Sequence, residues 1–425
     1  MTLRPALVCL TVALPAVLVR LTGIHPAAPI ALIVYGAGVV AASFVLAWAA
    51  EAAEVDISGG LATALLALIA VLPEYAVDLY FAHTAGSDPA YTAYAAANMT
   101  GSNRLLLGLG WSMVAGLALL IASRRAGRPV RELVLDTGYR RELGFLAIAA
   151  GVAFVMPLTG QIHLLLGIGL LGFFGFYLWR AAVSGNHSEP DLVGPAARIG
   201  ALPTHQRRPL VVALFVAAGL IILASAEPFA ESLVASGQTL GIDQFLLVQW
   251  LAPFASESPE LIVAVLFALR GRGAAALGLL ISAKVNQWTL LVGSLPVAYA
   301  IGGGSTALPL DGRQVEEVLL TATQTALGVA VLLSLRFPRW AAPALFGLFA
   351  VQFAIPGQHG RLMLSLVYAV LAAAVLFRHR DWILPTLAAP FRSGRDEVSS
   401  PAEREPVLAG HGDGRTASAP PPRSR

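Results

Sequence analysis

Two glutamates stand inside an apolar stretch in the second half of the sequence. ASESPELIV places Glu257 and Glu260 between FLLVQWLAPF and AVLFAL, in a chain with 25 acidic residues among 425. The same Pro-Glu pair recurs in AVLPEYAVD, where Asp78 follows Glu74 by one helical turn and lies on the same helix face. Carboxylates in such surroundings are suited to binding a cation or exchanging a proton. These four acids therefore form the candidate chemical centre.

Placing these acids inside apolar helices is energetically unfavourable, and a function in the protein would explain why they are there. Insertion scales assign about 2.5 to 3.5 kcal/mol to a central acidic residue and return only about 0.3 to 0.6 kcal/mol for each strongly apolar one. Two glutamates would thus cancel most of the insertion free energy of residues 243–269. Packing is a poor explanation for that cost. The alternative that stays open is a protonated or helix-paired carboxylate that stabilises a helix bundle.

The composition shows which elements must position the acids. The chain is 57% hydrophobic and 12% charged. Its many uncharged segments of about 17 or more residues are long enough to cross a bilayer as helices. The sequence thus predicts an all-α polytopic membrane protein with about twelve transmembrane helices, embedded in the lipid bilayer. The predicted spans are residues 5–21, 29–52, 58–82, 92–122, 143–157, 162–183, 209–236, 243–269, 273–301, 316–336, 340–356 and 361–377.

Arginine sets the predicted orientation. The loop of residues 123–142 is rich in arginine, and the positive-inside rule places it in the cytoplasm. Counted alternately from this loop, the other arginine-rich loops and both termini are also cytoplasmic, which suits a plasma membrane and favours a span over a signal sequence after Arg4. Because the net charge of +3 comes from these loops, it is no sign of nucleic-acid binding. The single Cys9 excludes an internal disulfide framework.

Changes in composition divide the chain. Residues 184–208 are polar and rich in Pro and Gly, and they separate six predicted spans from six. Residues after about 386 lack the apolar surface needed to fold. The predicted parts are an N-terminal helix (1–28), a first transmembrane repeat (29–183), a cytoplasmic linker (184–208), a second repeat (209–356), a C-terminal helix (357–385) and a disordered tail (386–425).

The two halves contain an internal repeat. Asn103 follows Glu74 by 29 residues, and Asn286 follows Glu260 by 26 residues, each in the span after the Pro-Glu helix. The Pro-Glu helices are the third and eighth predicted spans, so five spans separate corresponding elements. An odd offset means that the two copies cross the membrane in opposite directions. The sequence predicts two inverted five-helix repeats plus extra terminal helices.

Prolines precede the paired glutamates in both copies. Pro73 and Pro259 each remove a backbone donor and free a carbonyl about one turn earlier, so we expect both helices to break at membrane depth. Freed carbonyls beside a carboxylate give an oxygen-rich cage that suits hard cations such as sodium or calcium.

The motifs of the first repeat resemble a known family. Pro-Glu in one helix, followed in the next by the run of Asn98, Gly101, Ser102 and Asn103, is similar to the alpha-repeats of the sodium/calcium exchanger superfamily of cation antiporters. The resemblance covers about residues 29–356. It implies a ten-helix core with an ion site at mid-membrane, between the Pro-Glu helices and the helices that follow them.

The resemblance also implies ligands. Glu74 and Glu260 would be the principal cation-coordinating carboxylates, with Ser102 as a supporting oxygen ligand. Family members carry hydroxyl residues ahead of the Pro-Glu pair, and here only the second repeat keeps one, Ser256. For Asn103 the alternative to a role in the site is hydrogen bonding between helices, and the same holds for Asn286.

The second repeat departs from the family pattern. Lys284 and Val285 stand where Gly-Ser is expected, and Glu257 and Asp78 are additional acids. Lys284 is the only lysine of the chain. Its ammonium could take the place of a cation, pair with Glu257 or Glu260, or release a proton when an ion arrives. The alternative is a fixed internal salt bridge.

The sequence thus predicts a secondary antiporter that exchanges sodium or calcium against protons or another cation by alternating access. Glu74 and Glu260 would bind the ion, while Asp78, Glu257 and Lys284 adjust the charge of the site. Two alternatives are a cation channel or uniporter, and a non-transporting membrane scaffold with a degenerate ion site. An enzyme is not expected, because no His/Cys ligand cluster and no nucleophile-base pair is present. No cofactor is predicted, inorganic cations are the expected partners, and the oligomeric state stays open.

Overall fold

The computed structural model describes residues 4–53, 55–56, 72–183, 192, 194–355 and 357–392. Within these residues ten helices are long and apolar enough to cross a membrane. Together with α4 and the shorter apolar helix α16 they confirm the predicted all-α polytopic fold. Residues 1–390 form one compact unit.

The elements of the first half are α1 (Arg4–Thr22), α2 (Ala28–Ala53), α4 (Leu72–Ala85), α5 (Tyr91–Leu105), the π-helical η1 (Leu106–Trp111), α6 (Ser112–Ala126), β1 (Glu132–Val134), α7 (Tyr139–Ala153), α8 (Val155–Thr159), β2 (Gln161–His163) and α9 (Leu164–Val183). Those that follow are α10 (Gly194–Gly200), α11 (Thr204–Leu240), α12 (Gln244–Leu269), α13 (Gly273–Asn286), the π-helical η2 (Gln287–Leu291), α14 (Val292–Ile301), β3 (Ala307–Pro309), α15 (Gly312–Leu332), β4 (Arg336–Pro338), α16 (Ala341–Ala354), α17 (Gln358–Arg378), η3 (Arg380–Trp382), α18 (Ile383–Ala388) and η4 (Ala389–Phe391).

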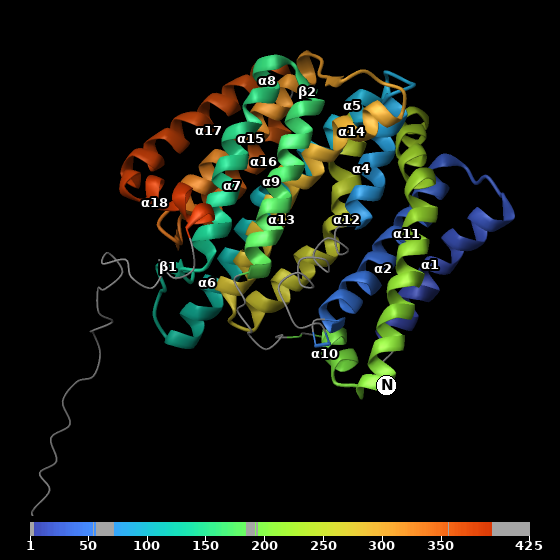
Figure 1. The fold of residues 1–425 in the computed structure, drawn as a ribbon, viewed down its shortest axis with the longest axis horizontal. Coiled ribbons are helices and arrows are strands. Elements are labelled where there is room, and N and C mark those ends of the chain that lie inside the picture. The colour runs from blue at the N-terminus through green and yellow to red at the C-terminus, as the bar shows by residue number, and fades with distance from the viewer. Residues whose placement is uncertain are drawn as a thin grey trace, which may run out of the picture. The chain divides into compact units, whose positions relative to one another are not determined.

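The two halves are interleaved. Helix α2 packs against α11, the helix in the corresponding place of the second half, and α1 covers both (Figure 1). Helix α12 of the second half packs against α5 of the first. The short strands follow the same rule, because β1 pairs antiparallel with β4 and β2 pairs antiparallel with β3. Each ladder therefore joins a loop of one half to a loop of the other, as an inverted repeat requires.

A π-helical turn begins within three residues after the aligned asparagine in both halves. Segment η1 begins three residues after Asn103, and η2 begins directly after Asn286. A π-helical turn shifts the backbone pairing from i+4 to i+5 and is frequently found at functional sites. The shared position of these turns agrees with the alignment of the two asparagines.

The helix break predicted at Pro259 is absent. Helix α12 continues through Pro253 and Pro259 without interruption. In α4, Pro73 is the second residue of the described part, so the expected break at Pro73 falls at the edge of the described residues and stays a prediction. The predicted span 58–82 begins outside the described residues, which resume at Leu72. Neighbouring helices can hold a proline-containing membrane helix together, which explains why α12 stays intact.

The segment expected to be a linker has structure of its own. Residues 194–200 form α10, and α11 begins at Thr204. The Arg207 guanidinium donates to both carboxylate oxygens of Asp56 at 2.8 Å, and Arg208 donates to Asp56 at 3.1 Å. These arginines, Arg207 first, lower the pKa of Asp56 to about 2. The end of α2 is thus tied to the start of α11.

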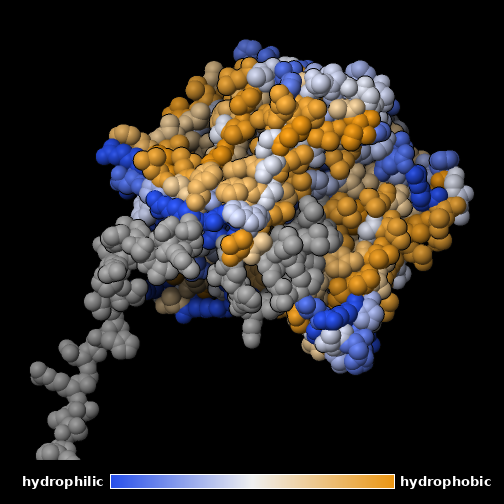
Figure 2. Space-filling model, viewed as in Figure 1, coloured by the Kyte–Doolittle hydropathy of each residue, from blue (hydrophilic) through white to orange (hydrophobic). Residues whose placement is uncertain are grey.

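The surface fits a lipid environment. Figure 2 shows hydrophobic side chains over most of the visible face, with hydrophilic side chains gathered towards its edges. Large apolar side chains are exposed along α1, α9, α11 and α17. The predicted tail begins with the short elements α18 and η4, and residues 393–425 lie outside the described part of the chain.

Candidate functional site

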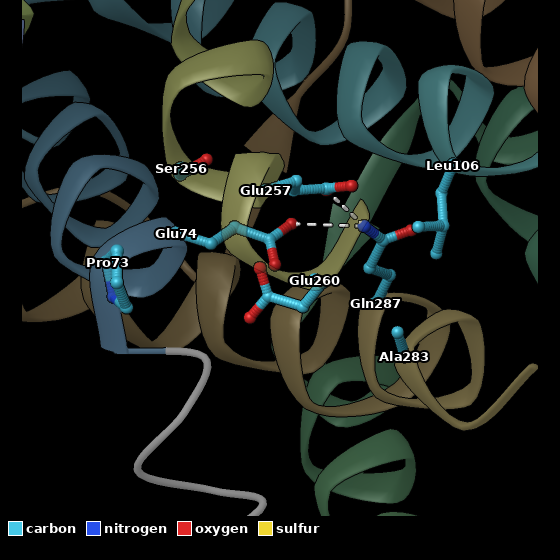
Figure 3. Close-up of a pocket in the computed structure, with 8 residues that line it drawn as sticks. All are labelled: Pro73, Glu74, Leu106, Ser256, Glu257, Glu260, Ala283 and Gln287. Atoms are coloured by element: carbon cyan, nitrogen blue, oxygen red, sulfur yellow. Dashed lines mark hydrogen bonds between the residues drawn. The ribbon is translucent and has the colours of Figure 1, made fainter. Parts of the chain in front are cut away.

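A small cavity lies where the two Pro-Glu helices meet. Its volume is about 20 Å³, which is room for one water molecule or one bare cation. The carboxylates of Glu74, from α4, and of Glu260, from α12, point towards each other across it (Figure 3). The lining residues are Pro73, Glu74, Leu106, Ser256, Glu257, Glu260, Ala283 and Gln287.

Gln287 connects the carboxylates of the two halves. Its Nε2 donates to Oε1 of Glu74 at 3.4 Å and also to Oε1 of Glu257 (Figure 3). Gln287 is the first residue of η2 and is buried. The sequence analysis missed this residue, although it directly follows Asn286. Its place beside Asn286 in the repeat was the only feature of the sequence that could have indicated a role at the site.

Several buried oxygens of the site accept no hydrogen bond from the described residues. They include Oε2 of Glu257 and Oε2 of Glu260. The Ser102 hydroxyl and Oδ2 of Asp78, two residues that do not line the cavity, are also without a hydrogen-bond partner in the described part of the chain. Buried carboxylate oxygens are normally satisfied, so a set without partners indicates a place where a cation or a proton binds.

The predicted residues are not all at the cavity. Glu74, Glu257, Glu260 and Ser256 line it, and the Ser256 hydroxyl donates to Ala252 O at 3.2 Å. Asp78 lies outside the lining and accepts a hydrogen bond from Asn98 Nδ2 at 2.7 Å.

The two predicted asparagines take different partners. Asn286 Oδ1 accepts a hydrogen bond from the Tyr75 hydroxyl at 2.9 Å, which links the end of α13 to α4. Asn103 Nδ2 donates to Met99 O at 3.1 Å within its own helix. Neither asparagine lines the cavity. In this structure both asparagines form hydrogen bonds near the cavity and do not contribute to its lining.

Lys284 has a partner other than the predicted glutamates. Its Nζ donates to the backbone oxygen of Asn103 at 2.8 Å and to Asn103 Oδ1 at 3.1 Å. The side chain is fully buried, and Nζ lies 5.8 Å from the centre of the Trp288 ring. No ion pair within 4 Å joins it to a carboxylate of the described residues.

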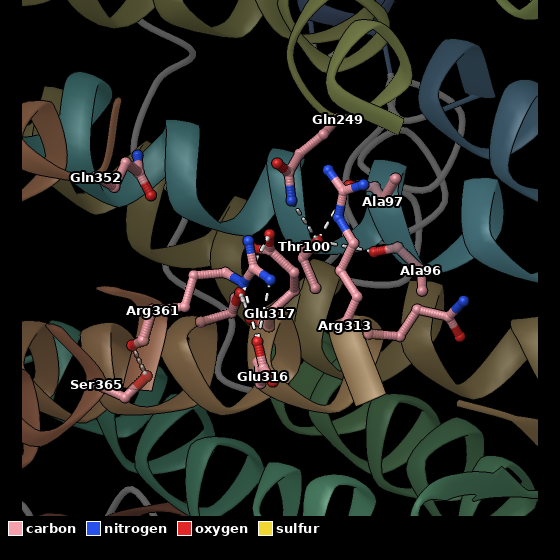
Figure 4. Close-up of polar contacts among 12 residues, drawn as sticks. Ala96, Ala97, Thr100, Gln249, Arg313, Glu316, Glu317, Gln352, Arg361 and Ser365 are labelled. Atoms are coloured by element: carbon pink, nitrogen blue, oxygen red, sulfur yellow. Dashed lines mark hydrogen bonds and ion pairs between the residues drawn. The ribbon is translucent and has the colours of Figure 1, made fainter. Parts of the chain in front are cut away.

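Arg104 belongs to a second buried polar cluster, outside the cavity. Its guanidinium pairs with Glu317 of α15 at 2.6 Å and donates to Gln352 of α16 at 3.1 Å. Arg361 of α17 pairs with Glu316 at 3.0 Å and reaches Glu317 at 3.7 Å (Figure 4). This cluster ties α17 to the core.

The carboxylates alone do not complete a metal cage. Within the described ranges no group of three or more His, Cys, Asp or Glu side chains is placed to hold a metal ion. A cation in the cavity would therefore also need neutral oxygens, such as those of Gln287 and Ser256. Oxygen ligands of both kinds suit hard cations. The arrangement can bind such a cation and can bind protons in its place.

Comparisons with known proteins identify the scaffold. The family model for the sodium/calcium exchanger protein matches residues 27–183 and 210–356. A solved structure of an H⁺/Ca²⁺ exchanger, CAX, is 43% identical with a TM-score of 0.84, covering 91% of this chain and 97% of that one. Native YfkE is 16% identical with a TM-score of 0.56, covering 86% and 99%. The sodium-calcium exchanger NCX_Mj is 18% identical with a TM-score of 0.50, covering 82% and 99%. These last two show the fold alone. A search of curated protein sequences gave no match.

Proposed function

The chain belongs to the sodium/calcium exchanger family of cation antiporters, and from this premise we propose that it exchanges calcium for protons across a membrane. The single observation that carries the proposal is the cavity at which glutamates of both halves meet, with buried carboxylate oxygens that lack partners among the described residues. Calcium binds carboxylate and amide oxygens, and the same carboxylates can take up protons.

The proposed roles follow from the geometry. Glu74 and Glu260 face each other and would be the principal ligands, while Gln287 and Ser256 would supply neutral oxygens. Glu257 would adjust the charge of the site through Gln287. Ion and protons then compete for one set of carboxylates, and the two fluxes are coupled if the site changes sides only when it is occupied by one or the other. Because the cavity lies between the halves, movement of one half against the other would expose it alternately to the two sides.

Calcium is favoured over sodium by two observations. The solved structure with 43% identity over 91% of the chain is titled an H⁺/Ca²⁺ exchanger. The second half also lacks the Gly-Ser pair that would add a neutral ligand, since Lys284 and Val285 stand there. We further propose that the protein resides in the plasma membrane with both termini in the cytoplasm, as the distribution of arginines predicts.

The proposal is tested with purified protein in liposomes that are acidic inside and contain a pH-sensitive dye. Calcium added outside should dissipate the gradient in a saturable manner, whereas sodium and potassium should leave it largely intact. Empty liposomes and liposomes with the Glu74→Gln variant are the controls. Calcium flux without any opposite movement of protons or another ion would identify a channel or uniporter. Absence of any flux would favour a non-transporting membrane scaffold.

A further inference from the structure

The surroundings of Lys284 are those of a bound cation. Its Nζ faces two oxygens of Asn103 and the Trp288 ring, which all attract positive charge. The orientation of the Asn103 amide follows from its own hydrogen bond, because Nδ2 donates to Met99 O and Oδ1 is left to face the lysine. These contacts supply acceptors for the N–H groups of an ammonium and offer no donor to the lone pair of a neutral amine.

Lys284 does not use up the acids of the site. No carboxylate of the described residues lies within 4 Å of Nζ, and its hydrogen bonds go to Asn103 instead. Oε2 of Glu257 accordingly stays without a hydrogen-bond partner in the described part of the chain. Burying an ammonium in a membrane protein costs free energy, and such residues usually have a functional role. Here it adds positive charge beside the cavity while the carboxylates remain available to ions.

The two halves differ at the position of Lys284, and only the second half departs there from the family pattern. When Asn103 is aligned with Asn286, Lys284 corresponds to Gly101. In the first half a side chain at this position would force α5 and α12 apart, because a Cβ on Gly101 would overlap the backbone oxygen of Gln249. At the corresponding position of the second half, the Lys284 side chain extends to Asn103 of the first half.

We propose that Lys284 is a tethered monovalent cation: its ammonium permanently fills an oxygen-lined position beside the calcium site that a soluble sodium or potassium ion would otherwise occupy. The chain thereby exchanges calcium and protons without a second metal ion, and Lys284 itself carries no proton across the membrane. This inference rests on the proposed calcium/proton exchange and specifies the ion requirement of that site.

The charge of Lys284 can be observed in the unaltered protein. Because it is the only lysine among 425 residues, lysine labelled with ¹⁵N at Nζ gives a single side-chain signal. We expect this signal to remain that of an ammonium over the whole pH range of transport, with and without saturating calcium. Conversion to a neutral amine on adding calcium or raising the pH would overturn the proposal and identify Lys284 as a proton carrier.

A variant tests the position as an ion site. Lys284→Ala leaves room for an ion, and its calcium flux should be low in choline buffer and be restored by sodium, potassium or n-propylammonium. Lys284→Met fills the space without a charge and should not be restored, and Lys284→Arg keeps a fixed charge and should need no added ion. Wild-type flux should be the same in all these buffers.

The outcomes separate the two proposals. Absence of calcium-driven proton flux in the wild type rejects the proposed function. Wild-type flux together with a folded Lys284→Ala protein that ignores monovalent cations rejects only the tethered cation. If Lys284→Ala does not fold, the lysine signal of the native protein decides the matter.

Discussion

The two halves of the molecule treat equivalent positions in different ways. With Asn103 aligned to Asn286, Arg104 corresponds to Gln287. Arg104 turns away from the cavity to pair with Glu317, whereas Gln287 turns into it and binds Glu74 and Glu257. The first half thus directs its buried cation towards structural helices, and the second half keeps its cation, Lys284, next to the site. The two halves thus each supply one glutamate of the shared pair, and they differ in where their other buried polar side chains point.

The largest expected effect tests the shared pair. Glu74→Gln and Glu260→Gln should each abolish calcium-driven proton flux, because each removes a charged oxygen ligand from the cavity. Glu257 has no counterpart in the first half, so Glu257→Gln should weaken calcium affinity by only about 10- to 100-fold, the effect typical of a supporting residue around a metal. Flux in liposomes and calcium titration of purified protein measure both. A loss with Glu257→Gln as complete as that with Glu74→Gln would break the distinction between shared and added acids.

The next effect concerns stability and Arg104, the buried cation of the first half that points away from the cavity. Glu317→Gln should lower the free energy of unfolding by about 3 to 5 kcal/mol, because it removes the paired carboxylate of buried Arg104. Arg104→Gln should cost less, since Glu317 keeps Arg361 at 3.7 Å. Equilibrium unfolding in mixed micelles measures these values. The double variant should recover much of the loss, and strictly additive losses would show that the two charges do not act as a pair.

A smaller effect tests why the first half carries glycine where the second carries lysine. Gly101→Ala should destabilise the protein by roughly 1 to 3 kcal/mol, the usual range for overpacking, because the new methyl group meets the backbone of α12. Gly169→Ala is the matched control, since nothing lies within 4 Å of a Cβ at that helical position. The control should be neutral or stabilising by up to about 1 kcal/mol. Equal stability of the two variants would contradict the close approach of α5 and α12.

The smallest effect tests the link between the halves at Asp56. The pKa of Asp56 is lowered to about 2 by Arg207 and Arg208, from an ordinary value of 3.8. A carboxylate with a lowered pKa stabilises the folded state above its ordinary pKa and loses that contribution as the pH falls towards the folded value. The thermal midpoint of the wild type should therefore approach that of Asp56→Asn between about pH 4 and pH 2.

The control for this link is a more exposed ion pair. Arg20 and Glu227 also join the two halves, at 2.6 Å, but both side chains are nearly half exposed. Glu227→Gln should change the free energy of unfolding by less than about 1 kcal/mol at neutral pH. A difference between Asp56→Asn and wild type that is independent of pH down to 2 would show that the carboxylate is not the stabilising group.

The sequence predicted the frame of the site better than its contacts. The apolar segments and the inverted Pro-Glu pair indicated the fold, and they indicated that acids of both halves would be central, because such features depend on local composition and spacing. The partner of Lys284 lies 181 residues away, and Gln287 reaches Glu74 across 213 residues. Such contacts depend on how helices from different halves pack, which periodicity does not encode. Intact α12 shows the same limit, since a proline breaks a helix only if its neighbours allow it.

The contact of Arg361 with Glu316 has a consequence for the order in which the protein is made. The two residues are 45 positions apart, and Arg361 lies beyond the segment matched by the family model. Before α17 has been synthesised, Arg104 is the only remaining cation that pairs with Glu316 or Glu317 among the residues that the structure describes. We therefore expect the charge pairing of α15 to be completed only after α17 has been inserted beside it.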